Sequence, residues 1–165
     1  MRVAKWLLAA WCLVVGCAPT LSAQTQVRGF VAPGVRHDTG EPTVEMGGSV
    51  DRAGYRGFGV GVSVGWMKAR KSKGWAPVVR LQVSHAWRAD ESRIAPFVAV
   101  GLSWAPLFDT PFGVTLGAGL NAWVRDHVAV HLAFRDDLFL GRRPHQYYGA
   151  PIGVIWTTAN PGASK

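Results

Sequence analysis

Residues 55–66 alternate between bulky apolar and small side chains, and a period of two is typical of a β-strand. The bulky face holds Phe58, Val60, Val62, Val64 and Trp66. The opposite face holds Gly57, Gly59, Gly61, Ser63 and Gly65. Neither of these faces carries a charge, so neither suits water, whereas glycine fits a strand that lines a narrow, filled interior. The pattern therefore predicts lipid against the bulky face and a tight lumen against the small face.

The same alternation recurs along the chain, and no run after residue 24 has the length of a membrane helix. We predict eight strands, at residues 27–36, 43–51, 55–66, 75–88, 95–104, 112–124, 128–138 and 146–156. The predicted fold class is all-β, an eight-stranded antiparallel up-and-down transmembrane β-barrel whose two ends finish on one side. The register of the first strand stays open, because its valines oppose a face that mixes Phe30 with two arginines.

The start of the chain is typical of an export signal. Arg2 and Lys5 precede an apolar run at residues 6–16, which is too short for a bilayer-spanning helix of roughly 20 residues. We expect cleavage after Ala23, and lipidation of Cys17 is the alternative. The predicted organisation is a signal peptide at 1–23, an outer-membrane β-barrel domain at 24–156 and a flexible tail at 157–165.

Composition narrows the possible partners and chemistry. The 165 residues allow one domain, and both cysteines, Cys12 and Cys17, lie in the leader, so disulfides and cysteine-based sites are not expected. The net charge of +8 falls to +6 without Arg2 and Lys5, which favours anionic partners. For an exported chain we expect these to be lipid head groups rather than nucleic acid.

The interior of an eight-stranded barrel is just wide enough to be filled by side chains, so charges inside it must be paired. Inward positions carry Glu45, Arg80, Arg135 and His131, together with Gln82, Asn121 and Asp137. We predict a lumen network of Glu45, Arg80, Arg135 and His131, with Glu45, Arg80 and Arg135 in the outer half of the lumen. The network is expected to act as interior struts, with gating or binding as the alternative. No serine is placed for His131, and no ligand spacing points to a metal, so no catalytic residue, metal or other cofactor is expected.

Connections after the second, fourth and sixth strands are short and are interpreted as periplasmic turns, which makes the alternate connections outer loops. In this orientation the lipid-facing aromatic residues gather in two girdles, as membrane interfaces favour. The outer girdle holds Trp66, Trp75, Trp104, Phe112 and Tyr148, and the inner girdle holds Trp87 and Trp156. The alternative is that these are strand-end aromatics of a soluble barrel core.

The outer loops are basic. One carries Lys68, Arg70, Lys71 and Lys73, and another carries Arg142 and Arg143. Lipopolysaccharide phosphates lie at this height, and lysine and arginine contact phosphates well, so contact with lipopolysaccharide is predicted. Generic solvated loop charge is the alternative.

Two segments carry a resemblance to a known family: the glycine-rich strand and turn at residues 117–130, which continues to the stretch Phe134 to Asp137, and the closing run from Tyr147 to Trp156. They resemble the hairpin and the aromatic-terminated last strand of small bacterial outer-membrane β-barrel domains, the OmpA/OmpX-like eight-stranded barrels. The resemblance implies recognition by the barrel assembly machinery and a fold rather than an activity, since such barrels include adhesins, anchors and lipid-modifying enzymes. One departure is that nine residues follow Trp156.

The sequence therefore predicts a non-enzymatic protein of the Gram-negative outer membrane, with a plugged lumen and a structural or surface-interaction role in the cell envelope. Two alternatives stay open. One is a soluble exported β-barrel that binds an apolar ligand with its valine, leucine and tryptophan face inward. The other is an outer-membrane lipid-modifying enzyme that depends on His131 or His145. The sequence does not indicate the oligomeric state.

Overall fold

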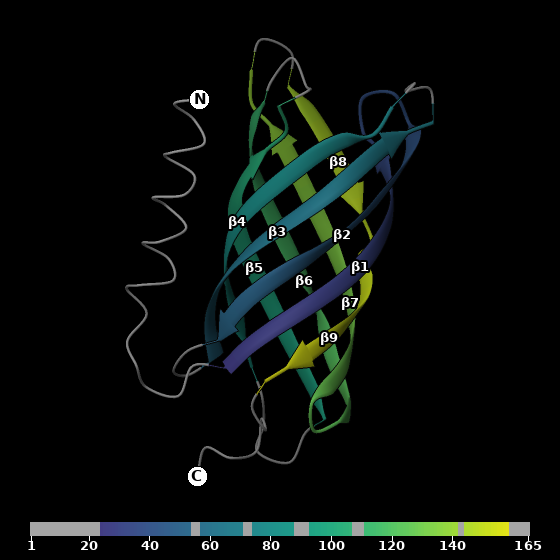
Figure 1. Cartoon of the computed structure of the whole chain (residues 1–165). Helices are drawn as coiled ribbons and strands as arrows, with labels where there is room; N and C mark the ends of the chain where they lie inside the picture. The colour runs from purple at the N-terminus through teal and green to yellow at the C-terminus, as the bar shows by residue number, and fades with distance from the viewer. Residues whose placement is uncertain are drawn as a thin grey trace.

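The computed structural model describes residues 24–53, 57–70, 74–87, 93–106, 111–141 and 144–158. The predicted signal peptide and most of the predicted tail lie outside these residues. The strands are β1 (Gln24–Arg36), β2 (Glu41–Ala53), β3 (Phe58–Ala69), β4 (Ala76–Ala86), β5 (Ile94–Trp104), β6 (Phe112–Arg125), β7 (Val128–Phe139), β8 (His145–Gly149) and β9 (Ile152–Thr157). Figure 1 shows them wound around a single axis, with their connections at the two ends. In the described segments, no helix has the length and hydropathy that a membrane-crossing helix needs.

The sheet closes on itself. Consecutive strands from β1 to β7 pair antiparallel, and β1 also pairs with β8 and β9, which in turn pair with β7. Because β8 and β9 together occupy one place in the sheet, the architecture is the predicted eight-stranded antiparallel barrel, and the predicted fold class is confirmed. Closure gives every strand of the described residues two neighbours, so none of these strands has an exposed edge.

The last strand differs from the single predicted segment at 146–156 because it is interrupted at Ala150 and Pro151. Proline has no N–H to donate to the ladder, so regular pairing stops there. The Ala150 N–H donates to the Pro33 carbonyl at 2.8 Å, and the Ala133 N–H donates to the Pro151 carbonyl at 3.0 Å. These two bonds hold the interruption in the wall of the barrel.

The connections define two ends of the barrel. The loop end holds the connections at 37–40, 70–75, 105–111 and 140–144, and the turn end holds those at 54–57, 87–93 and 126–127, with the start of β1 and the end of β9. Loop length separates the two ends less clearly than predicted, because the connection at 87–93 is as long as the one at 105–111. Gly40 (φ 64°) and Gly57 (φ 83°) take left-handed conformations that few other residues tolerate at turns.

The barrel has apolar side chains on its exterior and small or polar side chains inside, which is the reverse of a water-soluble protein. On β3, Phe58, Val60, Val64 and Trp66 are exposed on the exterior, while Gly59, Gly61, Ser63 and Gly65 are buried. The ambiguous first strand follows the same rule, with Val27 and Val31 outside and Phe30 inside. The predicted parity of β3 is therefore confirmed, and the open register of the first strand is resolved.

Candidate functional site

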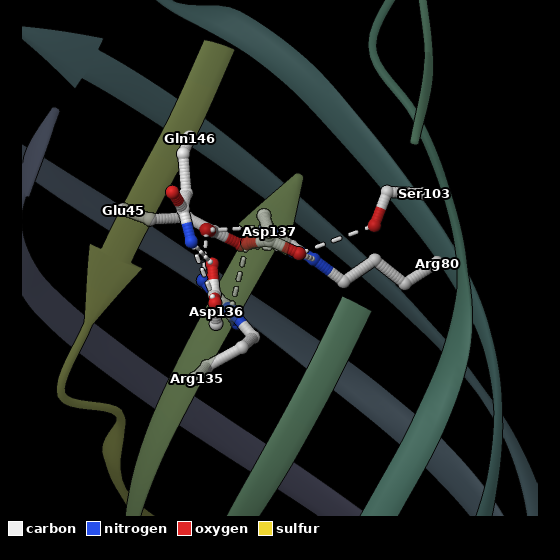
Figure 2. Close-up of polar contacts among 7 residues, drawn as sticks. All are labelled: Glu45, Arg80, Ser103, Arg135, Asp136, Asp137 and Gln146. Carbon is white, nitrogen blue, oxygen red and sulfur yellow. Dashed lines mark hydrogen bonds and ion pairs between the residues drawn. The ribbon is translucent and has the colours of Figure 1, made fainter. Parts of the chain in front are cut away.

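The loop-end half of the lumen contains an ion-pair cluster, which we call the upper cluster: Glu45, Arg80, Ser103, Arg135 and Asp137. The Arg80 guanidinium donates to Glu45 Oε1 and Oε2 at 2.7 and 2.9 Å, and to Asp137 Oδ1 and Oδ2 at 2.9 and 2.8 Å. Arg135 donates to Asp137 Oδ2 at 3.0 Å and also to Glu45 Oε2. Figure 2 shows Arg80 and Arg135 directed at the carboxylates of Glu45 and Asp137. Arg80 is on β4, Glu45 is on β2, and Arg135 and Asp137 are on β7.

The upper cluster is deeply buried and its charges balance. Arg80 is 1% exposed, Glu45 2% and Asp137 1%. Two guanidinium groups face two carboxylates, and the Ser103 hydroxyl donates to Asp137 Oδ1 at 3.1 Å. Bidentate arginine–carboxylate pairs are the geometry that compensates best for taking charges out of water. The predicted network of Glu45, Arg80 and Arg135 is brought together here.

A second polar group, the lower cluster, lies nearer the turn end: Arg28, Ser49, Asp51, Gln82, Asn121 and His131. Arg28 Nη2 and the Ser49 hydroxyl donate to Asp51 Oδ2 at 3.0 and 2.7 Å, and Gln82 donates to Asp51 Oδ1 at 3.0 Å. Arg28 and Asp51 form an ion pair, so this cluster is also balanced.

His131 belongs to the lower cluster and not to the network predicted for it with Glu45, Arg80 and Arg135. Its Nε2 lies 3.1 Å from Arg28 Nη1, and its Nδ1 lies 2.8 Å from Asn121 Oδ1. Because guanidinium can only donate, Nε2 accepts and Nδ1 carries the hydrogen. The ring also stacks on Phe97 at 5.0 Å. Both ring nitrogens are therefore engaged, which leaves neither free to act as a base.

Apolar side chains lie at both ends of the lumen. Met67, Val78, Ala105, Phe139 and Tyr147 pack together at the loop end. Trp123, Ala129 and Ile155 pack together at the turn end. A cavity of about 10 Å³ beside the upper cluster is lined by Glu45, Arg135, Asp137 and Tyr147, among others. Such a space holds about one water molecule.

The mouth at the loop end carries a third polar group. Arg36 donates to both oxygens of Asp38 at 2.7 Å, and its Nη2 lies 2.8 Å from His145 Nδ1. These hydrogen bonds from Arg36 hold the pKa of the exposed Asp38 carboxyl below its usual range. The group joins the β1–β2 connection to the start of β8.

The predicted aromatic residues lie on the exterior of the barrel near its ends. Trp66, Trp75, Phe112, Trp87 and Trp156 are exposed, and Trp104 and Tyr148 are partly exposed. Lys68 continues the exterior parity of β3 beyond Trp66, and its Nζ lies 5.8 Å from the centre of the Trp75 ring. Arg70, two residues after Lys68, is exposed. Lys71, Lys73, Arg142 and Arg143, the other predicted basic residues, lie outside the described residues.

Charged members of both clusters are not part of the network predicted from the sequence. Asp137 was named as an inward residue but not as a network member, although two arginines and one glutamate already require a second carboxylate. The Arg28–Asp51 pair was missed because the register of the first strand was open.

Among the described residues, no group of three histidine, cysteine, aspartate or glutamate side chains is arranged to hold a metal ion.

Comparison with known proteins supports the fold at low sequence identity. No protein-family model matches the sequence, and no curated protein matches it. The N-terminal β-barrel domain of Pseudomonas aeruginosa OprF is similar with a TM-score of 0.65 and 14% identity, over 81% of this chain and 96% of that one. Neisserial surface protein A is similar with a TM-score of 0.63 and 11% identity, over 81% and 96%. The outer membrane enzyme PagL is similar with a TM-score of 0.55 and 14% identity, over 78% and 98%.

These likenesses and the closed sheet define the class. The chain has the fold of the small eight-stranded outer-membrane β-barrels. At such identities the shared feature is the fold, and no residue role transfers with it.

Proposed function

We propose that this protein is a β-barrel of the bacterial outer membrane with a plugged lumen and a structural or surface-interaction role, without enzymatic activity. The observation that carries the proposal is the reversed distribution of side chains, with an apolar exterior and balanced charge clusters inside. A transmembrane barrel needs this arrangement because lipid surrounds its outer wall. In a soluble barrel that binds an apolar ligand, the valine and leucine rows would face inward, which is opposite to their position here.

The packing of the described residues supports a plugged lumen. The two charge clusters fill the middle of the barrel, and the apolar groups around Phe139 and Trp123 cover them from the two ends. A chain of this kind supports the envelope or presents its loops rather than conducting solutes.

The surface-interaction part of the proposal is contact with lipopolysaccharide at the loop end. Lys68 is the described residue that supports it best, because it lies on the exterior parity beside Trp66 and Trp75. The tryptophan rings suit the membrane interface, and an ammonium group at that height suits a lipid phosphate. Arg70, Lys71, Lys73, Arg142 and Arg143 add positive charge to the same connections.

Two measurements test this function. Fractionation with heat-modifiable gel migration tests the membrane barrel: we expect the protein in the outer-membrane fraction, with compact fast migration before boiling. Recovery in a detergent-free soluble fraction would contradict it.

For the lipid contact, replacing Lys68, Arg70, Lys71 and Lys73 by glutamine should weaken binding to lipopolysaccharide vesicles and reduce the salt dependence of that binding. The matched control replaces Arg93 and Arg125 at the turn end, and equal binding by both variants would remove the lipopolysaccharide contact.

Two observations support non-enzymatic character. Both ring nitrogens of His131 are engaged in hydrogen bonds, and His145 Nδ1 faces Arg36 and Asp38. PagL shows that the same fold can carry an enzyme. Assay of lipid hydrolysis with the wild type and with His145→Gln tests the point, and we expect no activity from either.

A further inference from the structure

Three aromatic rings form a small cluster on the exterior at the turn end: Phe58 on β3, His85 near the end of β4, and Trp87 directly after β4. The His85 ring lies 4.4 Å from Phe58 and 4.6 Å from Trp87, measured between ring centres. Phe58 is 57% exposed and Trp87 50%. His85 therefore presents a polar ring on an otherwise apolar outer wall.

The contacts of His85 determine which nitrogen carries its hydrogen. Its Nδ1 is buried and has no hydrogen-bond partner in the described part of the protein. A hydrogen on Nδ1 would leave a buried donor without an acceptor, and such orphaned N–H groups are rarer than orphaned acceptors. The neutral tautomer with hydrogen on Nε2 is therefore favoured, and this N–H is directed to whatever surrounds the barrel.

The depth of His85 indicates which acceptor it meets. Trp87 lies two residues nearer the barrel end, which is about 7 Å along a strand and about 5 Å of depth for the usual strand tilt. Tryptophan rings sit at the level of the lipid head groups. His85 then lies on the hydrocarbon side of that level, where ester carbonyl oxygens are the acceptors of a phospholipid.

We infer that Phe58, His85 and Trp87 form a binding site for a diacyl glycerophospholipid, in which His85 Nε2 donates a hydrogen bond to an ester carbonyl oxygen. The Phe58 and Trp87 rings flank the glycerol backbone and the first methylenes of the acyl chains. This site is at the opposite end of the barrel from Lys68 and takes an uncharged group rather than a phosphate. The inference rests on the proposed membrane location.

Vesicles of ester-linked and ether-linked phosphatidylcholine of equal chain length separate the carbonyl from the rest of the lipid. One hydrogen bond changes the ratio of folded to unfolded protein by about fivefold. We expect wild-type protein to show a ratio about fivefold higher in ester vesicles than in ether vesicles at one denaturant concentration. His85→Phe should lose this difference, whereas His127→Phe, a change in the exposed turn at 126–127, should keep it.

Equal stability of the wild type in the two lipids would overturn the site while leaving the membrane barrel intact. Failure of the wild type to insert into either vesicle would instead contradict the proposed function. If His85→Phe does not fold, ¹⁵N-histidine NMR of the wild type in nanodiscs decides: hydrogen on Nε2 with a contact to the lipid glycerol region supports the site. Hydrogen on Nδ1, or no lipid contact, overturns it.

Discussion

Arg80 shows how a single residue can organise the inside of this barrel. Its guanidinium makes four hydrogen bonds to two carboxylates and is 1% exposed. Arginine suits this position better than lysine, because its planar fork meets both carboxylates in bidentate geometry. The charge is compensated only while both Glu45 and Asp137 stay in place.

Arg80→Met should lower the free energy of unfolding by about 3–5 kcal/mol, because it leaves a buried carboxylate uncompensated. Urea unfolding in vesicles, followed by tryptophan fluorescence, measures the loss. The charge-balanced control is the double variant Arg80→Met with Asp137→Asn, in which Arg135 still pairs with Glu45. The double variant should lose less than the single one, and a larger loss would show that the charge balance does not matter.

At the mouth of the barrel, we expect the stabilisation contributed by Asp38 to depend on pH. Its pKa is lowered in the folded protein by the hydrogen bonds from Arg36. A lowered folded pKa means that this stabilisation is complete above the unfolded value of about 3.9 and is lost as the pH falls through the folded value. Carboxyl NMR titration should show Arg36→Gln moving the Asp38 pKa upward and His145→Gln moving it less. An unmoved Asp38 pKa in Arg36→Gln would contradict this assignment.

At the scale of single strands, the contacts between β3 and β2 explain why the inner face of β3 is made of small residues. A Cβ atom at Gly65 would collide with the Glu45 carboxylate, and one at Gly61 would collide with the Asp51 carboxylate. The glycines therefore make room for the acidic partners of Arg80 and Arg28. Glycine is unfavourable in a strand by itself, but here the space it leaves is occupied by an ion pair.

Gly65→Ala should lower the free energy of unfolding by about 1–3 kcal/mol through overpacking against Glu45. Gly29→Ala is the matched control, because a Cβ there meets nothing within 4 Å. We expect the control to change stability by less than about 0.5 kcal/mol. Equal losses of stability in the two variants, measured by the same unfolding assay, would mean that Gly65 is not needed to leave space for the Glu45 carboxylate.

The strands also show how far the sequence predicts the structure. Period-two alternation is a local signal, and it located the eight wall segments and the inward side of β2, β3, β4 and β6. The interruption of the last strand at Pro151 depends on its pairing with β1 and β7, which local alternation does not report. The register of β1 had the same difficulty, because local alternation does not report that Arg28 pairs inside the barrel with Asp51 on β2.

For the whole molecule, three properties combine: a closed wall, an apolar exterior and an interior of balanced charges. Aromatic rings lie near both ends of the exterior, and Lys68 adds a cation beside them at the loop end. The lumen chemistry was predictable in kind, because a filled barrel must pair its charges. The division into an upper and a lower cluster was not, since it depends on which residues of distant strands share a level along the axis.

The most direct test of this account is a nitroxide scan along β3 in reconstituted vesicles. Single spin labels at positions 60, 62 and 64 should collide often with oxygen, which partitions into lipid, and rarely with a water-soluble nickel complex. A label at Asp126, in the exposed turn, should show the opposite preference. If the labels at 60, 62 and 64 are shielded from oxygen or accessible to nickel, the valine rows do not face acyl chains and the account is wrong.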